Sequence, residues 1–147
     1  MSKYKIAVVG FGNVGREVFN AIEESPDMET AGIVIRNPQK MQAVKRIVGD
    51  VPVTTDVREL GKVDVAILSI ASRSVPEVAP KFLELGINTV DSFDIHGDEI
   101  IRLRQKLDSI AKAHNAVAVI SAGWDPGSDS IVRALVEVVA PRGLTYT

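Results

Sequence analysis

Residues 5–15 read KIAVVGFGNVG, an apolar stretch that runs directly into a turn of the form G-x-G-x-x-G. A β-branched strand that leads through such a turn into a helix is typical of a dinucleotide-binding β-α-β unit. Gly10 permits the tight turn, Gly12 lets the backbone approach a pyrophosphate, and Gly15 lets the helix pack closely on the strand. The N–H groups at the helix start favour a bound phosphate. The stretch therefore predicts a nucleotide site, and the alternative is a glycine turn with a purely structural role.

The end of the second predicted strand, residues 31–35, indicates the kind of dinucleotide. NAD-preferring sites usually place an acidic residue here, about 20 residues past the glycines, where it accepts from the ribose 2′-hydroxyl. This chain instead has Arg36 and Asn37. A guanidinium can hold a 2′-phosphate through two parallel hydrogen bonds, whereas a carboxylate would repel it. The sequence favours NADP over NAD, and the alternative is that Arg36 is a solvated loop cation.

Composition is that of an ordinary globular domain. The chain has 147 residues, of which 46% are hydrophobic and 24% charged, and this length predicts one domain. A net charge of −2 gives no electrostatic reason to expect nucleic acid or an anionic membrane as a partner. The absence of cysteine excludes disulfides, thiolate nucleophiles and cysteine-based metal sites. With neither a signal-peptide pattern nor an apolar run near the ~20 residues of a membrane span, the cytoplasm is the expected location.

Predicted strands alternate with predicted helices along the rest of the chain. The strands are expected at residues 5–9, 31–35, 51–53, 63–70, 87–90 and 116–120. Helices are expected after the glycine turn, from a Ser74 cap to Gly86, at 97–113 and at 129–139. The buried stripe of the first helix is predicted to contain Val14, Val18, Ala21 and Ile22. This alternation predicts an α/β fold with a doubly wound parallel sheet of the Rossmann type and right-handed crossovers.

Polar or glycine-rich segments follow three of the predicted strands, at residues 69–73, 91–98 and 121–127. Ligands in such sheets bind beyond the carboxyl ends of the strands, so these segments should meet near the glycine turn. Asp94, Trp124 and Asp125 would then form a candidate substrate site of two carboxylates and an aromatic ring. Taken alone, Trp124 is also compatible with a core position, and Asp125 with an ordinary turn.

The spacing Asp94-x-His96-x-Asp98 could also hold a metal ion. Helix capping explains these residues better, because Asp98 falls in the first turn of a predicted helix. No metal site is therefore predicted.

Four segments resemble meso-diaminopimelate dehydrogenases, particularly their broad-specificity bacterial branch. These segments are GFGNVGRE at 10–17, SRSVPEVAPKFLELGINTVDS at 72–92, VDSFDIHGD at 90–98 and SAGWDPGSDSIVRAL at 121–135. The resemblance extends over essentially the whole chain. It implies NADP-dependent, reversible oxidative deamination of meso-2,6-diaminopimelate at its D-centre, giving L-2-amino-6-oxopimelate and ammonia. The reverse reaction, reductive amination of a 2-oxo acid, would supply lysine and cell-wall biosynthesis.

The resemblance also implies which residues form the site. Residues 11–14 would hold the pyrophosphate, Arg36 the 2′-phosphate, and Asp94, Trp124 and Asp125 the reacting end of the substrate. The implied cofactor residues are Gly10, Phe11, Gly12, Asn13, Val14, Gly15, Arg36, Asn37, Ser69, Ile70, Ala71, Ser72, Ser92, Phe93, Asp94 and Gly123. Many relatives have Ser-Arg-Arg or Arg-Arg where this chain has Ile35-Arg36-Asn37, which predicts a weaker 2′-phosphate clamp. No residue is an evident general base.

Length is the larger departure from that family, whose members are about twice as long. Residues 1–127 would form the Rossmann core, and 128–147 a helix and strand leading into an absent second domain. The chain is then expected to hold the cofactor half of a homodimeric enzyme and to be inactive alone. The alternative is a complete, non-catalytic dinucleotide-sensing module. In the last helix, apolar residues cover more than one face, which predicts that another surface packs on it. These residues are Ile131, Val132, Leu135, Val136, Val138 and Val139.

Overall fold

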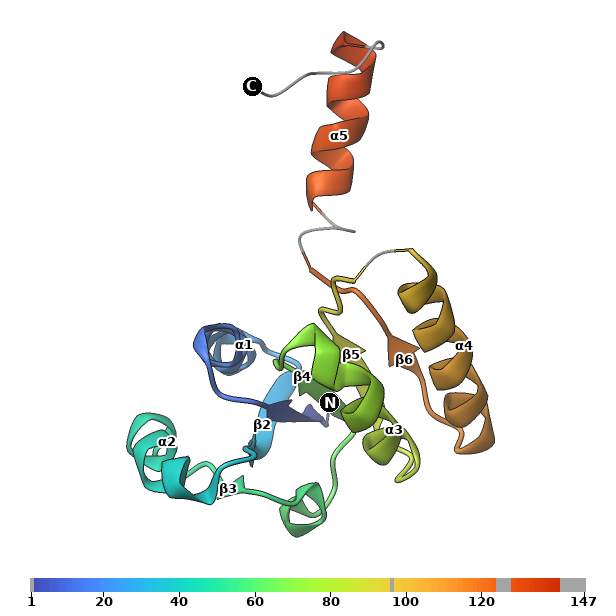
Figure 1. Ribbon diagram of the computed structural model, residues 1–147. Helices are drawn as coiled ribbons and strands as arrows, with labels where there is room; N and C mark the ends of the chain where they lie inside the picture. Colours follow the sequence, from blue (N-terminus) through green and yellow to red (C-terminus); the bar gives the residue numbers. More distant parts are fainter. Residues whose placement is uncertain (1, 96, 124–127, 141–147) are drawn as a thin grey trace.

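The protein forms a six-stranded parallel sheet with strand order β3-β2-β1-β4-β5-β6 and helices on both faces (Figure 1). The computed structural model describes residues 2–95, 97–123 and 128–140. The strands are β1 Tyr4–Val9, β2 Met28–Val34, β3 Val53–Thr54, β4 Val65–Leu68, β5 Asn88–Asp91 and β6 Ala118–Val119. The helices are α1 Asn13–Glu24, α2 Met41–Val48, α3 Val75–Leu83, α4 Asp98–Ala113 and α5 Ser128–Val139, with short 3₁₀ turns η1 Pro38–Lys40, η2 Val57–Leu60 and η3 Ser72–Ser74. The predicted fold class is confirmed.

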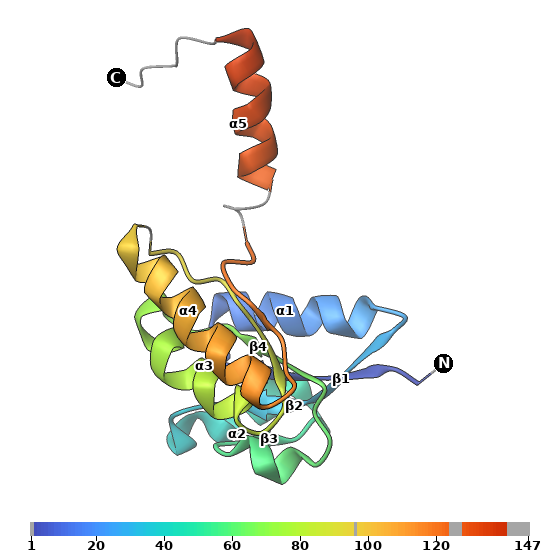
Figure 2. The same cartoon turned by 90° about the vertical axis from the view of Figure 1, so that its right-hand side faces the viewer.

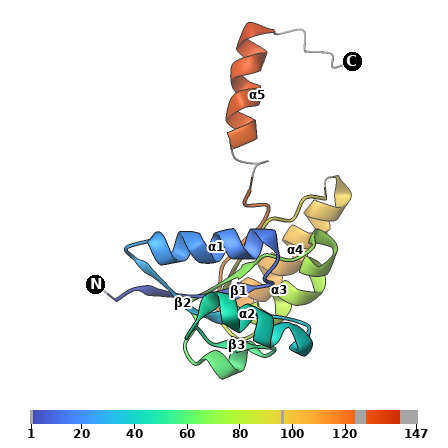
Figure 3. The same ribbon diagram turned by 90° about the vertical axis from the view of Figure 1, so that its left-hand side faces the viewer.

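Both faces of β1, in the middle of the sheet, are buried, as expected where helices cover both sides of a parallel sheet. Ile6 and Val8 of β1 pack in one apolar cluster with Ile22 of α1 and Val44 of α2. Ala7 and Val9 belong to the opposite cluster, which includes residues of α3 and α4. Figure 3 shows α1 and α2 on the near side with α3 and α4 behind them, and Figure 2 shows the same layers from the opposite side.

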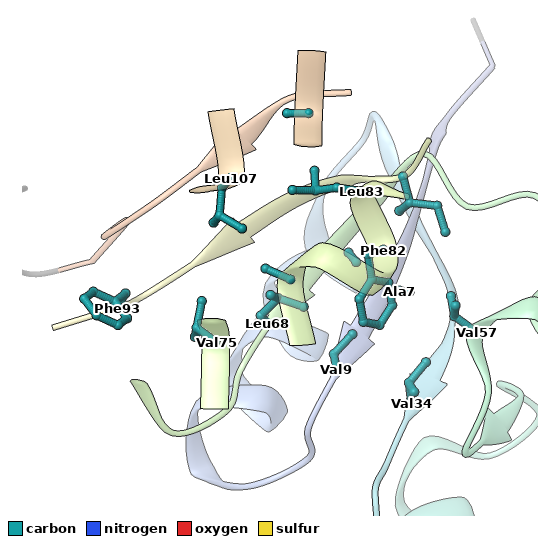
Figure 4. Close-up of a cluster of buried hydrophobic side chains, with 14 of the residues drawn as sticks. Ala7, Val9, Val34, Val57, Leu68, Val75, Phe82, Leu83, Phe93 and Leu107 are labelled. Carbon is teal, nitrogen blue, oxygen red and sulfur yellow. The ribbon is translucent and has the colours of Figure 1, made fainter. Parts of the chain in front are cut away.

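The larger core lies between the sheet, α3 and α4 (Figure 4). Leu68, Leu83 and Leu107 are at most 1% exposed there, and each contributes about 1.5–3 kcal/mol relative to an exposed position. This core fixes the carboxyl ends of β1, β4 and β5 relative to one another. The strand order reverses between β1 and β4, so these ends border the switch point at which ligands bind in open α/β sheets.

Two details of the predicted helices were wrong. Gly15 and Ile22 lie on the buried face of α1, whereas Val14 and Ala21 are exposed. Val14 and Ala21 each come directly before a buried residue. Consecutive side chains of an α-helix point about 100° apart, so each of these two lies outside the buried stripe. Ser74 makes no capping hydrogen bond, because its backbone is already helical at the end of η3 and a capping side chain needs an extended backbone.

Helix α5 stands apart from the sheet in Figures 1 and 2. Ile131, Leu135 and Val138 are 65%, 64% and 81% exposed, which agrees with the predicted broad apolar surface. A second apolar surface lies on the sheet, where Val119 of β6 is 46% exposed and its neighbour Val90 is half-buried. The register places both on the face that α1 and α2 cover elsewhere. In the described part of the chain, no helix combines the length and apolar character that a membrane span requires.

Candidate functional site

The glycine turn joins β1 to α1 at the switch point. Gly10 has φ +89°, and a Cβ there would lie 2.5 Å from the carbonyl oxygen of Ser69. A Cβ on Gly15 would lie 2.1 Å from the carbonyl oxygen of Gly10. Both positions therefore require glycine, the first for the turn and the second so that α1 packs on it. The roles predicted for these two residues are confirmed.

Gly12 occupies the N-cap of α1 and faces open space. Among the described residues, no atom beyond its chain neighbours lies within 4 Å of the position that its Cβ would take, and no side chain caps the helix. The first turn of α1 contains no acidic residue. The first helical bond runs from the Arg16 N–H to the Gly12 carbonyl at 3.0 Å, so the preceding N–H groups point out of the helix end. An open, uncapped helix start suits an anionic group such as a pyrophosphate.

The segment that follows β4 contacts this turn, the loop after β5 contacts that segment, and the loop after β6 contacts the β5 loop. The Ser69 N–H donates to the Val9 carbonyl at 2.8 Å, and the Asp94 N–H donates to Ser72 Oγ at 3.1 Å. Gly123 lies beside Ser92, with 3.9 Å between its Cβ position and Ser92 Cβ. Trp124 and Asp125 lie outside the described residues.

Asp91, at the end of β5, connects two of these loops and was not predicted. Its Oδ1 accepts from the Phe93 N–H at 2.9 Å and from the Ser121 N–H at 3.2 Å. The side chain is 2% exposed, and burial raises its pKa although the two N–H donors oppose this shift. In the described part of the chain, Asp91 Oδ2 and Ser121 Oγ have no hydrogen-bond partner. The sequence could have indicated that Asp91 is buried, because side chains alternate along a strand and Asp91 therefore lies on the same buried face as Thr89.

An open cavity of about 790 Å³ lies beside the glycine turn, at the carboxyl ends of β1 and β2. Residues 55–58, the turn after β4 and the outer part of α3 form its other walls. Of the predicted cofactor residues, Gly10, Arg36, Ile70 and Ala71 line this cavity. The others lie in the glycine turn, the first turn of α1 and the loops after β2, β4, β5 and β6. Among them, Phe93 is buried in the larger core, so its side chain is not available to a cofactor.

Charges of both signs surround the cavity. Arg36, Arg58 and Lys81 line it together with Asp56 and Glu84. Hydrogen bonds from Arg58 lower the pKa of Asp56 to about 2, so this carboxylate stays ionised near neutral pH. The predicted residue Asn37 has a local role here, because its side-chain oxygen caps η1 by accepting from the Gln39 N–H at 3.0 Å.

This fold and this glycine turn place the protein in a known class. The chain belongs to the Gfo/Idh/MocA oxidoreductase family, which has an NAD-binding Rossmann fold and whose family model matches residues 4–90. Within that class, five curated relatives are named meso-diaminopimelate D-dehydrogenase, in agreement with the resemblance seen in the sequence. One of them, from Bacteroides fragilis, is 51% identical over the whole chain.

Solved structures agree with this assignment. The chain matches Corynebacterium glutamicum DAP dehydrogenase in complex with DAP at a TM-score of 0.75 and 38% identity, over 95% of this chain and 42% of that one. An engineered D-amino acid dehydrogenase bound to NADP⁺ matches at a TM-score of 0.74 and 38% identity, over 94% of this chain and 42% of that one. The chain spans about half the length of the curated relatives it matches, 48% for the Bacteroides fragilis protein.

Proposed function

We propose that this chain is the cofactor-binding part of an NADP-dependent meso-diaminopimelate dehydrogenase. The observation that carries the proposal is the open, uncapped start of α1 beside a cavity that has Arg36, rather than a carboxylate, at the end of β2. The enzyme would catalyse reversible oxidative deamination of meso-2,6-diaminopimelate at the D-centre. Its products would be L-2-amino-6-oxopimelate, ammonia and NADPH, and the reverse reaction would serve lysine biosynthesis.

Each part of the dinucleotide has a matching part of the site. Residues 11–14 would bind the pyrophosphate through backbone N–H groups, and Arg36 would bind the 2′-phosphate. The loops that contain Ser72, Ser92 and Gly123 would border the nicotinamide. This assignment is supported by the contacts that join the β5 and β6 loops to the β4 loop, which itself contacts the glycine turn.

The chemistry requires that a hydride leave the carbon that bears the D-amino group, and the bound nicotinamide supplies the acceptor. That amino group must first lose its extra proton, because only then can the nitrogen lone pair form the imine that water hydrolyses. Asp94 and Asp125 would attract the ammonium form and fix its position, with Trp124 against the substrate. We assign no general base to these loops.

The partners proposed for the whole enzyme follow from the same chemistry. The substrate is a small amino acid or 2-oxo acid, and neither nucleic acid nor a membrane is expected. We propose a homodimer, because the apolar residues of α5 are exposed in the single chain. The cytoplasm is the proposed location, since the reaction draws on the cell's pool of nicotinamide dinucleotide.

Turnover of meso-diaminopimelate tests this function. The chain alone should form NADPH only negligibly from NADP⁺ and the substrate. A fusion of residues 1–147 to the remaining part of the Bacteroides fragilis relative should form NADPH readily, with the unmodified relative as the reference. In that fusion, Asp94→Ala should lower the rate while NADPH binding persists. A folded fusion that binds NADPH but does not deaminate the substrate would contradict the proposal.

A further inference from the structure

Arg58 is a second guanidinium on the wall of the cavity that contains Arg36. It lies on η2, the short turn that follows β3, and its side chain is 73% exposed. No sequence motif singled it out, because it belongs to a local turn whose position beside the β2 end is set only by the folded sheet.

Asp56 holds the Arg58 guanidinium in a defined orientation. Arg58 Nε lies 2.9 Å and 3.0 Å from the two carboxylate oxygens, and Nη2 lies 2.5 Å from Oδ2. The same carboxylate accepts the Arg58 backbone N–H at 3.0 Å and caps the turn. The low pKa of Asp56 keeps this pair ionised at every pH near neutrality.

This pairing determines what Arg58 can recognise. One edge of its guanidinium is occupied and its charge is compensated by Asp56, so it is poorly suited to compete for a phosphate. Its flat faces remain accessible, and a guanidinium stacks favourably on aromatic rings. Within the described residues Arg36 makes no ion pair, and its charge is therefore available to an anion.

The rest of the cavity is suited to a flat, largely apolar group. Side chains of Val34, Ile70, Val78 and Phe82 line it on the side of the sheet and α3. A nucleobase is flat and apolar on its faces, and it gains affinity from stacking without the need for a charged partner.

We propose that Arg58, held by Asp56, stacks on the adenine ring of the bound dinucleotide and is a cofactor-positioning residue whose role is distinct from that of Arg36. This inference rests on the proposed function. Adenine is common to NADH, NADPH and AMP, whereas the 2′-phosphate occurs only in NADPH. Arg58 therefore determines affinity for all three ligands, and Arg36 determines the preference for NADPH.

The test is titration of the 147-residue chain with NADPH and NADH, and competition of 5′-AMP against NADH. Arg58→Ala should weaken the binding of all three ligands by a similar factor, about two- to thirty-fold. Arg36→Ala should weaken the binding of NADPH alone. Arg102→Ala, which removes a 77% exposed cation on α4 outside the cavity, should change none of them.

Two further variants separate the planar face from the charge. Arg58→Tyr keeps a flat face without a charge and should retain more affinity than Arg58→Lys, which keeps the charge without the face. Thermal melts of each variant should match the wild type, since Arg58 is largely exposed.

Two results would overturn the proposal. Unchanged NADH and AMP binding by Arg58→Ala would exclude stacking, and loss of NADPH binding alone would place Arg58 at the phosphate instead. In both cases wild-type binding leaves the proposed function intact. A wild-type chain that binds none of the three ligands would reject the proposed function and this inference together.

Discussion

Arg36 and Asn37 follow β2, at the position that generally sets cofactor preference in dinucleotide-binding Rossmann folds, and the structure gives them different surroundings. The side-chain oxygen of Asn37 caps η1, while Arg36 lines the cavity. The sequence predicted the place of Arg36 because strand ends have fixed roles in this fold. It did not predict that the Asp56–Arg58 pair lines the same cavity or that Asp91 accepts from the Ser121 N–H, because both depend on segments that only the tertiary structure brings together.

Replacing Arg36 with alanine should remove most of the preference for NADPH. A charge-assisted contact of this kind contributes about 1.5–3 kcal/mol, so NADPH should bind about ten- to a hundred-fold more weakly and NADH almost unchanged. Calorimetric titration of both cofactors measures this. Lys45→Ala, an exposed cation on α2 outside the cavity, is the control. Equal losses for NADH and NADPH would argue against a 2′-phosphate contact.

Asp91 should make stability depend on pH in a defined direction. Burial raises its pKa in the folded protein above 3.8, the ordinary value for an aspartate. The unfolded chain therefore gives up this proton first, and the Asp91 contribution to stability decreases as pH rises from below 3.8 through the folded pKa. Asp91→Asn keeps an acceptor for the Phe93 and Ser121 N–H groups without the buried charge. Its stability relative to the wild type should therefore increase between pH 4 and pH 7.5 in urea titrations.

Asp91→Ala provides the comparison for that series. It leaves the two buried N–H groups without their acceptor, so its free energy of unfolding should be about 1–3 kcal/mol below that of Asp91→Asn at each pH. If the asparagine variant instead loses stability relative to the wild type as pH rises, the assigned direction of the pKa shift is wrong.

Among the elements, the glycine turn and the central strands were predicted best because their pattern is local. β2 begins at Met28, earlier than predicted, since its first residues pair with Tyr4 and Lys5 of β1 through the backbone rather than through an apolar pattern. β6 is only Ala118–Val119, shorter than predicted, because this edge strand pairs with β5 alone. The apolar pattern does not indicate how many residues of an edge strand find partners.

Alanine substitutions at two glycines of the turn should affect different properties, stability at Gly15 and NADPH binding at Gly12. Gly15→Ala places a Cβ 2.1 Å from the Gly10 carbonyl oxygen and should cost about 1–3 kcal/mol of stability. The new Cβ of Gly12→Ala meets no atom of the described residues within 4 Å apart from its chain neighbours, so the chain should melt within a few degrees of the wild type. Its methyl group projects into the space proposed for the pyrophosphate and should weaken NADPH binding about tenfold or more. Melting curves and titrations of both variants test this, and full NADPH affinity in Gly12→Ala would remove the pyrophosphate from this position.

At the scale of the whole molecule, two apolar surfaces lack a partner among the described residues. One is the surface of α5 and the other is the open side of the sheet near Val119. Covering a few hundred Å² of apolar surface favours association by several kcal/mol, at about 25 cal/mol per Å², before the entropic cost of pairing. A second copy of the chain supplies both surfaces at once and is the occupant that we expect.

Self-association should therefore depend on α5. Sedimentation velocity at tens of micromolar should show dimers of the wild type, and monomers of a variant with Val132→Glu and Leu135→Glu, because charge on this surface opposes its burial. A matched variant with Lys112→Glu, an exposed residue at the end of α4, should remain dimeric. A monomeric wild type at this concentration would contradict the expectation that a second copy covers these surfaces.

The central claim is that this chain binds NADP, and calorimetric titration of the wild-type protein with NADPH and NADH tests it most directly. The account predicts saturable binding of one NADPH per chain, tighter than that of NADH. Absence of binding for both cofactors, or tighter binding of NADH, would contradict it.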